Sequence, residues 1–80
     1  MPKLPRVTGK DVVKALLKAG FQKFDQEGSH VYLHKRTGDT FGPRITVPVH
    51  SGKVLKPKTL RSILKASKIT VADFIDFLNK

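Results

Sequence analysis

The sequence predicts an α+β fold in which one helix, three antiparallel strands and two further helices follow one another. Apolar residues recur at helical spacing near both ends of the chain and alternate with polar residues in its middle. The hydrophobic content of 39% is enough for one small core. With 80 residues of even composition, the chain is expected to form a single domain over residues 1–80.

The first helix is expected over residues 9–19. Thr8 and Asp11 have the spacing of a capping box, with Asp in place of the usual Glu or Gln. Apolar residues then follow at helical spacing, and an Ala-Gly pair at 19–20 is typical of a helix C-terminus. Residues 1–7 contain two prolines and are expected to form an extended lead-in.

Three strands are expected in the middle of the chain, over residues 21–26, 29–36 and 44–50. The second and third of these alternate regularly between apolar and polar side chains. The segment 37–43 between them contains glycine and is expected to be a loop. Because Pro48 cannot donate a ladder hydrogen bond, the third strand is expected at an edge of the sheet.

Two helices are expected to close the chain, after a basic loop over residues 51–56. Pro57 fits the first turn of the second helix. Its buried stripe is expected to consist of Leu60, Ile63 and Leu64. Thr70 and Asp73 repeat the capping-box spacing before a short third helix. The helices are expected to cover one face of the sheet and to leave the other face to solvent.

The hydrophobic faces of the second and third strands suggest how these strands pair. Placing Val31 opposite Val49 puts all their apolar side chains on the covered face. The same register places His30 opposite His50 on the other face, where directly opposed Cβ atoms lie about 4.5–5.5 Å apart. A slip of two residues would preserve the faces but separate the two histidines.

The histidines favour acid–base chemistry over metal binding. Imidazole exchanges protons near neutral pH, so His30 is a candidate general acid or base, with His50 as a possible partner. RNA carries its own nucleophile, the 2′-hydroxyl, so its cleavage needs only proton transfer and positive charge around the phosphate. A metal site is not expected, because His30 and His34 lie about 13 Å apart along one strand at about 3.3 Å per residue. His30 could also be an ordinary polar strand residue.

Positive charge is the strongest compositional signal. The chain has 16 Lys and Arg against 6 Asp and Glu, which gives a formal net charge of +10. Residues 53–68 include six basic side chains and no acidic one, and such a field favours polyanions, with nucleic acid the commonest in a cytoplasm. A solvated face or an acidic protein partner would explain the charge equally well. Contacts with an RNA backbone are expected from Lys56, Lys58, Arg61 and Lys65.

The composition excludes several functional classes. The chain has no Cys, so it has no disulfide framework, zinc ribbon or thiol nucleophile. Its apolar runs are too short to cross a membrane and no signal-peptide pattern opens it, so a cytoplasmic location without a membrane partner is expected. Ser29 has no carboxylate-oriented His beside it, which argues against a hydrolase triad. So small a domain is expected to act on a large substrate at an open surface, without a cofactor.

Three segments together resemble the HicA family of toxins, also called YcfA-like, from bacterial and archaeal toxin–antitoxin modules. They are residues 4–21, the Gly28-Ser29-His30 motif and residues 45–78, which cover nearly the whole chain. The resemblance implies a double-stranded-RNA-binding-domain-like α-β-β-β-α fold, to which the short C-terminal helix is an addition. It also implies cleavage of mRNA with the His of the Gly-Ser-His motif as the key residue, and a HicB-type antitoxin as partner. Many relatives have a polar residue where this chain has Val31.

The leading hypothesis is therefore a metal-independent endoribonuclease toxin that cleaves mRNA with His30, supported by Gly28 and Ser29, and is neutralised by a HicB-type antitoxin. The alternative is a non-catalytic RNA-binding module of the same fold, which would not need His30 in its Gly-Ser context. A third hypothesis is a partner domain whose basic face docks an acidic protein.

Overall fold

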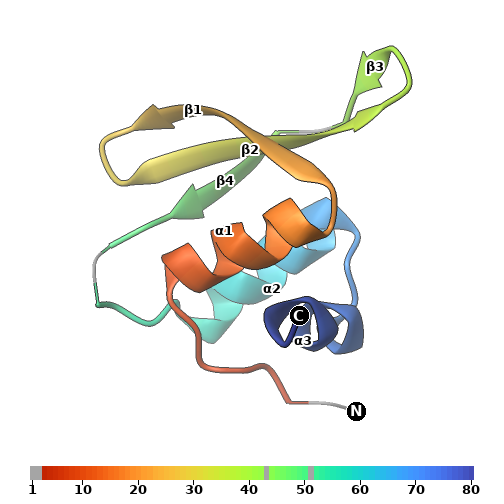
Figure 1. The fold of residues 1–80 in the computed structure, drawn as a ribbon. Coiled ribbons are helices and arrows are strands. Elements are labelled where there is room, and N and C mark those ends of the chain that lie inside the picture. Colours follow the sequence, from red (N-terminus) through yellow and green to blue (C-terminus); the bar gives the residue numbers. More distant parts are fainter. Residues whose placement is uncertain (1–2, 43, 51) are drawn as a thin grey trace.

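The computed structural model describes residues 3–42, 44–50 and 52–80. Figure 1 shows the sheet on one side of the molecule and the helices on the other. The elements are α1 (Gly9–Lys18), β1 (Phe21–Glu27), β2 (His30–Thr37), β3 (Thr40–Phe41), β4 (Ile45–Pro48), α2 (Pro57–Ser67) and α3 (Val71–Leu78). This order confirms the predicted α+β class and the α-β-β-β-α layout with its extra C-terminal helix. The first two residues of the lead-in, and positions 43 and 51 of the two expected loops, lie outside the described residues.

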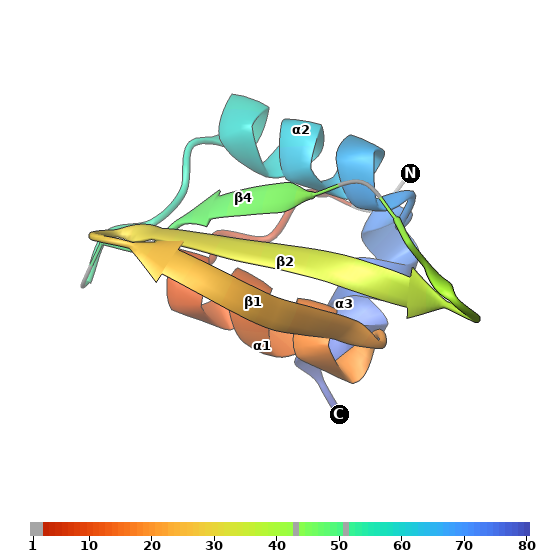
Figure 2. The same cartoon turned by 90° about the horizontal axis from the view of Figure 1, so that it is seen from above.

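The sheet is built around β2, which pairs antiparallel with β1 on one side and with β4 on the other. Figure 2 shows these three strands side by side, with β4 at an edge as Pro48 predicts. The short strand β3 pairs with Arg36 and Thr37 at the far end of β2. It lies in the segment that the sequence predicts to be a loop, so that prediction is wrong for Thr40 and Phe41.

The start of α1 is fixed by a capping box and by close contact with β4. Thr8 accepts a hydrogen bond from the Asp11 amide (3.3 Å), and the Thr8 amide donates to the Asp11 carboxylate (3.1 Å). A Cβ atom on Gly9 would lie 2.9 Å from the Cα atom of Val49 and closer still to the carbonyl oxygen of Pro48. Only glycine therefore allows α1 to begin against the end of β4.

The two C-terminal helices begin near the predicted residues. Pro57 opens α2, and the predicted stripe of Leu60, Ile63 and Leu64 is buried. The hydroxyl of Thr70 accepts from the Asp73 amide (3.1 Å) and caps α3. No helix among the described residues is long and apolar enough to cross a membrane.

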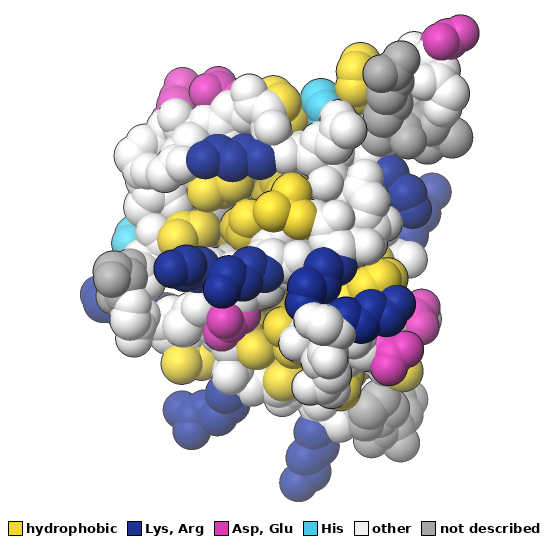
Figure 3. All heavy atoms as spheres, viewed as in Figure 1, with side chains coloured by type: hydrophobic (Ala, Val, Ile, Leu, Met, Phe, Trp, Pro, Cys, Tyr) yellow, Lys and Arg dark blue, Asp and Glu magenta, His cyan; other side chains and the backbone are white. Residues whose placement is uncertain are grey.

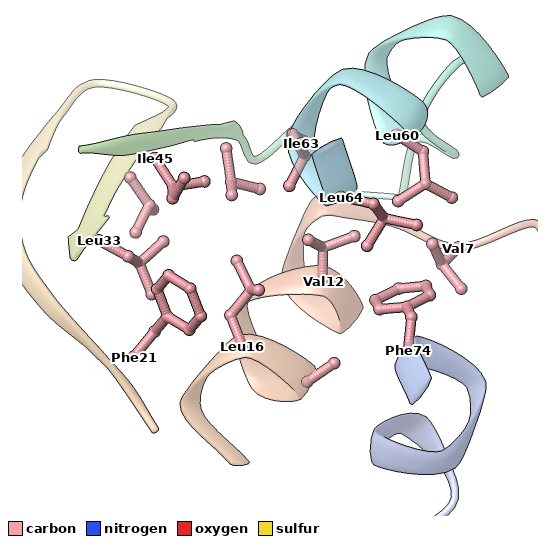
Figure 4. Packing of buried hydrophobic residues seen from close by; sticks show 13 residues of the cluster. Val7, Val12, Leu16, Phe21, Leu33, Ile45, Leu60, Ile63, Leu64 and Phe74 are labelled. Atoms are coloured by element: carbon pink, nitrogen blue, oxygen red, sulfur yellow. The ribbon is translucent and has the colours of Figure 1, made fainter. Parts of the chain in front are cut away.

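The core lies between the sheet and the helices, as Figure 4 shows. Its buried members come from all three helices, from β1, β2 and β4 and from the lead-in, and no polar or charged side chain of the described residues is buried with them. Phe21 and Phe74 belong to it. They are joined by Val7, Val12, Ala15, Leu16, Val31, Leu33, Ile45, Val47, Leu60, Ile63 and Leu64. The opposite face of the sheet has no helix over it (Figures 1 and 2).

Candidate functional site

The pairing of β2 with β4 differs from the expected register by two residues. Val31 lies opposite Val47, and His30 lies opposite Pro48, so the expected pairing of His30 with His50 is wrong. Both registers keep the apolar side chains on the covered face, so the hydrophobic pattern could not choose between them. The choice is made by backbone contacts, in which the Val49 amide donates to the Ser29 carbonyl at 2.6 Å and β4 ends against Gly9.

His30 is the first residue of β2 and follows a two-residue hairpin turn. Gly28 has a φ of +55°, which the first central position of a type II′ turn requires. Ser29 is half-buried and holds the turn against the end of β4 through its carbonyl group. Because Val31 is buried on the covered face, the exposed His30 side chain points to the open face of the sheet. The turn therefore requires glycine at position 28, whereas Ser29 acts through its backbone and the side chain of His30 is left exposed.

A carboxylate that the sequence analysis did not single out lies beside His30. Glu27 is the cross-strand neighbour of His30 on β1, and directly opposed Cβ atoms lie about 4.5–5.5 Å apart. The Tyr32 hydroxyl donates to the Glu27 carboxylate at 3.5 Å, the upper limit for a hydrogen bond. The sequence could have predicted this pairing of Glu27 with His30, because the residues on either side of a two-residue Gly-Ser turn form the first pair of a hairpin.

His50 follows β4 and contributes to a shallow hollow of about 310 Å³. The lining residues are Pro48, His50, Lys53, Val54, Leu55, Lys56 and Thr59. Pro48 is the cross-strand neighbour of His30, so the hollow begins one strand away from that histidine. Two lysines and one histidine are among its lining residues, and none of the described residues around it is acidic. Such a hollow suits an anionic group.

The four cations predicted to contact RNA are all exposed. Lys56 is the N-cap of α2 and lines the hollow, and its side chain makes no capping hydrogen bond. Lys58, Arg61 and Lys65 follow along the exposed side of α2.

Positive charge is also present elsewhere on the surface. Figure 3 shows Lys and Arg side chains gathered over the region of α1, where Lys10, Lys14 and Lys18 are exposed. Positive charge is therefore present on both α1 and α2 and is not confined to α2. Among the residues that the structure describes, no group of three or more His, Cys, Asp or Glu side chains is placed to hold a metal ion.

These features define a small basic α+β domain with a histidine site on the open face of its sheet. A family model described as "HicA toxin of bacterial toxin-antitoxin" matches residues 9–69. The match runs from the first residue of α1 through the His30 hairpin and α2, and it ends before α3. The chain therefore belongs to the HicA family and is a toxin of a toxin–antitoxin system. A search of curated proteins found no match.

Proposed function

We propose that this toxin is an endoribonuclease that cleaves mRNA in the cytoplasm by general acid–base catalysis at His30. The observation that carries the proposal is the exposed position of His30 on the open face, between the carboxylate of Glu27 and a cationic hollow. Membership of a toxin family supports a damaging activity, and the net charge of +10 supports a polyanionic substrate.

The proposed reaction uses the nucleophile that RNA itself provides. The 2′-oxygen attacks the adjacent phosphorus and the bond to the 5′-oxygen breaks, which leaves a 2′,3′-cyclic phosphate and a 5′-hydroxyl. One proton leaves the 2′-hydroxyl and one is delivered to the 5′-oxygen, and His30 carries out at least one of these transfers. Lys53 and Lys56 of the hollow would neutralise the charge that develops on the phosphate.

Glu27 is the residue best placed to assist His30. It lies opposite His30 on β1, whereas the position opposite His30 on β4, where His50 was expected, is occupied by Pro48. A carboxylate beside an imidazole orients the ring and stabilises its protonated form. His50 remains a candidate for holding a phosphate, because it shares the hollow with the two lysines.

The first test compares induced expression of the wild type, His30→Ala and His30→Gln, scored by growth and by total mRNA. Both variants are expected to relieve growth arrest and to spare mRNA. Because His30 is exposed, each should change the free energy of unfolding by no more than about 0.5 kcal/mol. The control is Gln22→Ala, which alters an exposed residue at the other end of the sheet and should remain toxic.

Purified proteins decide between cleavage and binding alone. If folded His30→Ala cleaves RNA at the wild-type rate, the proposed catalytic role is wrong. If the wild type binds RNA and cleaves none, the protein is the non-catalytic RNA-binding module of the alternative hypothesis.

We also propose that the partner is a HicB-type antitoxin that covers the His30 side of the sheet. A small acidic protein encoded next to the toxin is expected to restore growth on co-expression and to co-purify with it. Its complex with the toxin should cleave no RNA. Restored growth without a complex would contradict direct neutralisation.

A further inference from the structure

Four aromatic side chains lie in a row on the open face of the sheet, and we call them the aromatic row. Phe24 of β1 stacks on His34 of β2 with ring centroids 4.4 Å apart and planes 14° apart. His34 stacks in turn on Phe41 of β3 at 4.3 Å. Tyr32 of β2 lies 6.3 Å from Phe24 in a tilted arrangement. Three strands thus contribute to one aromatic surface.

The backbone has two features that build this row. The register of β1 with β2 shifts between Lys23 and Asp25, which makes Phe24 the extra residue of a β-bulge. Without the shift, Asp25 would lie opposite Val31, which is buried on the covered face. The bulge therefore keeps both Phe24 and Asp25 on the open face. The short strand β3 then adds Phe41 beyond the end of the main sheet.

The row is not explained by packing within the chain. The side chain of Phe24 is 47% exposed and that of Phe41 is 57% exposed, and they are two of the four exposed large hydrophobic residues that the structure describes. Stacking on His34 covers part of each phenyl ring, and the rest of each side chain stays exposed. Exposed apolar surface of this kind marks a binding surface more often than a structural one.

The chemistry of the face favours nucleobases as the ligand. The guanidinium group of Arg44 lies 5.0 Å from the centroid of the Tyr32 ring, at the edge of the row. Aromatic rings and guanidinium planes on an open sheet bind unpaired bases by stacking, and they tolerate any sequence. The strand residues described on this face include no aliphatic side chain other than Pro48, so flat rings make up most of its apolar surface.

The charges at the two edges of the sheet indicate how a strand of RNA would lie. The carboxylates of Asp25 and Glu27 are on the β1 side, whereas Arg44 and the cationic hollow are on the β4 side. A phosphate backbone would follow β4 and its bases would point toward the rings. His30 lies two residues before Tyr32 on the same face of β2, about 7 Å away at about 3.3 Å per residue.

We propose that the aromatic row binds unpaired bases of single-stranded RNA beside the bond that His30 cleaves. This assignment of substrate class rests on the proposed function for the role of His30, although stacking itself requires no cleavage. A fold named after double-stranded RNA binding would, on this surface, select unpaired segments of mRNA.

The first experiment uses the wild-type protein and RNA that it cannot cleave. Single-stranded 2′-O-methyl oligouridine lacks the nucleophilic hydroxyl, and an abasic strand of the same length provides the matched backbone. The chain has one Tyr and no Trp, so tyrosine fluorescence reports on Tyr32 alone. The strand with bases is expected to quench this fluorescence and to bind at least about fivefold more tightly than the abasic strand. Equal affinity without quenching would overturn the proposal.

The second experiment compares two double variants of the same residues. Phe24→Leu with Phe41→Leu keeps apolar bulk but removes the flat rings, whereas Phe24→Tyr with Phe41→Tyr keeps the rings. The leucine variant is expected to lose the preference of about fivefold or more for strands with bases, and the tyrosine variant to keep it. Equal binding of the abasic strand by both variants shows that they are folded. A leucine variant that keeps the preference, or that loses only antitoxin binding, contradicts the proposal.

Cleavage of unmodified RNA is measured separately for the wild type. Preference for bases without any cleavage would overturn the proposed function and leave the aromatic row as a base-binding surface. Cleavage without preference for bases would contradict base binding by the aromatic row and leave the proposed function in place.

Discussion

The two faces of the sheet carry different kinds of side chain, although the same strands supply both. On the covered face, Val31, Leu33 and Val47 are at most 5% exposed and pack against the helices. On the open face, His30 and Tyr32 alternate with them along β2 and are reached by solvent. Because successive strand residues point to opposite faces, one strand can hold the fold together with half of its side chains and leave the other half for chemistry.

The faces also differ in what holds their side chains in place. Covered side chains are positioned by close packing, which resists any change of volume. Open side chains are positioned by the backbone, through the Gly28 turn, the bulge at Phe24 and the β3 hairpin. Substitution should therefore destabilise the protein on one face and change its function on the other.

Leu33→Ala is expected to have the largest effect on stability. Its side chain is fully buried between the central strand and the helices, so truncation should lower the free energy of unfolding by about 2–5 kcal/mol. Chemical denaturation measures this against Thr46→Ala, which lies on the open face and should stay within about 0.5 kcal/mol of wild type. Similar losses of unfolding free energy in the two variants would show that the two faces do not differ in their contribution to stability.

Gly9→Ala tests the contact that joins α1 to the end of β4. The added methyl group would meet the backbone of Pro48 and Val49, which cannot move without shifting the strand. We expect a loss of about 1–3 kcal/mol by thermal or chemical unfolding. Lys10→Ala, at the next and exposed position of the helix, should cost almost nothing. A Gly9→Ala variant as stable as wild type would show that α1 and β4 are not held in this contact.

Charge reversal tests whether the cations of α2 act as a site or only as net charge. Lys58→Glu with Arg61→Glu should weaken binding to all RNA sequences by about tenfold or more. The slope of log affinity against log salt should fall by about 0.7 for each lost contact with a single strand. Lys10→Glu with Lys14→Glu on α1 changes the net charge equally. If both pairs weaken binding to the same extent, α2 holds no specific phosphate contacts.

Glu27→Gln and His50→Gln test which neighbour assists His30. Loss of an assisting acid or base typically costs a factor of about 100 or more, and loss of an orienting group less, so we expect Glu27→Gln to lower the cleavage rate by about tenfold. His50→Gln should change the rate by less than about threefold and weaken RNA binding through the hollow. Rates measured from about pH 5 to 9 distinguish the two, since only the true partner should alter the shape of the profile. The reverse ranking would restore His50 as the partner.

The sequence by itself determined the three helices, the three longer strands and the two faces of the sheet. Thr8 with Asp11 marks the start of α1, Pro57 marks that of α2, and the alternation along β2 separates buried from open positions. These features depend on neighbouring residues, whose spacing repeats with the period of a helix or a strand. The Gly-Ser-His motif was identified through the resemblance to the HicA family, because its three residues are adjacent in the sequence.

Only the tertiary structure decided which open-face residues are neighbours. A slip of two residues between β2 and β4 leaves every apolar side chain on its correct face, so periodicity cannot detect it. The register was set by contacts between distant segments, with Gly9 against Pro48 and Val49 bonded to Ser29. The bulge and the β3 pairing that assemble the aromatic row likewise depend on the partner strand. Because these contacts join distant segments, the sequence could not show that His50 lies away from the position opposite His30. It could not show the aromatic row either, since the row forms only when three strands pair.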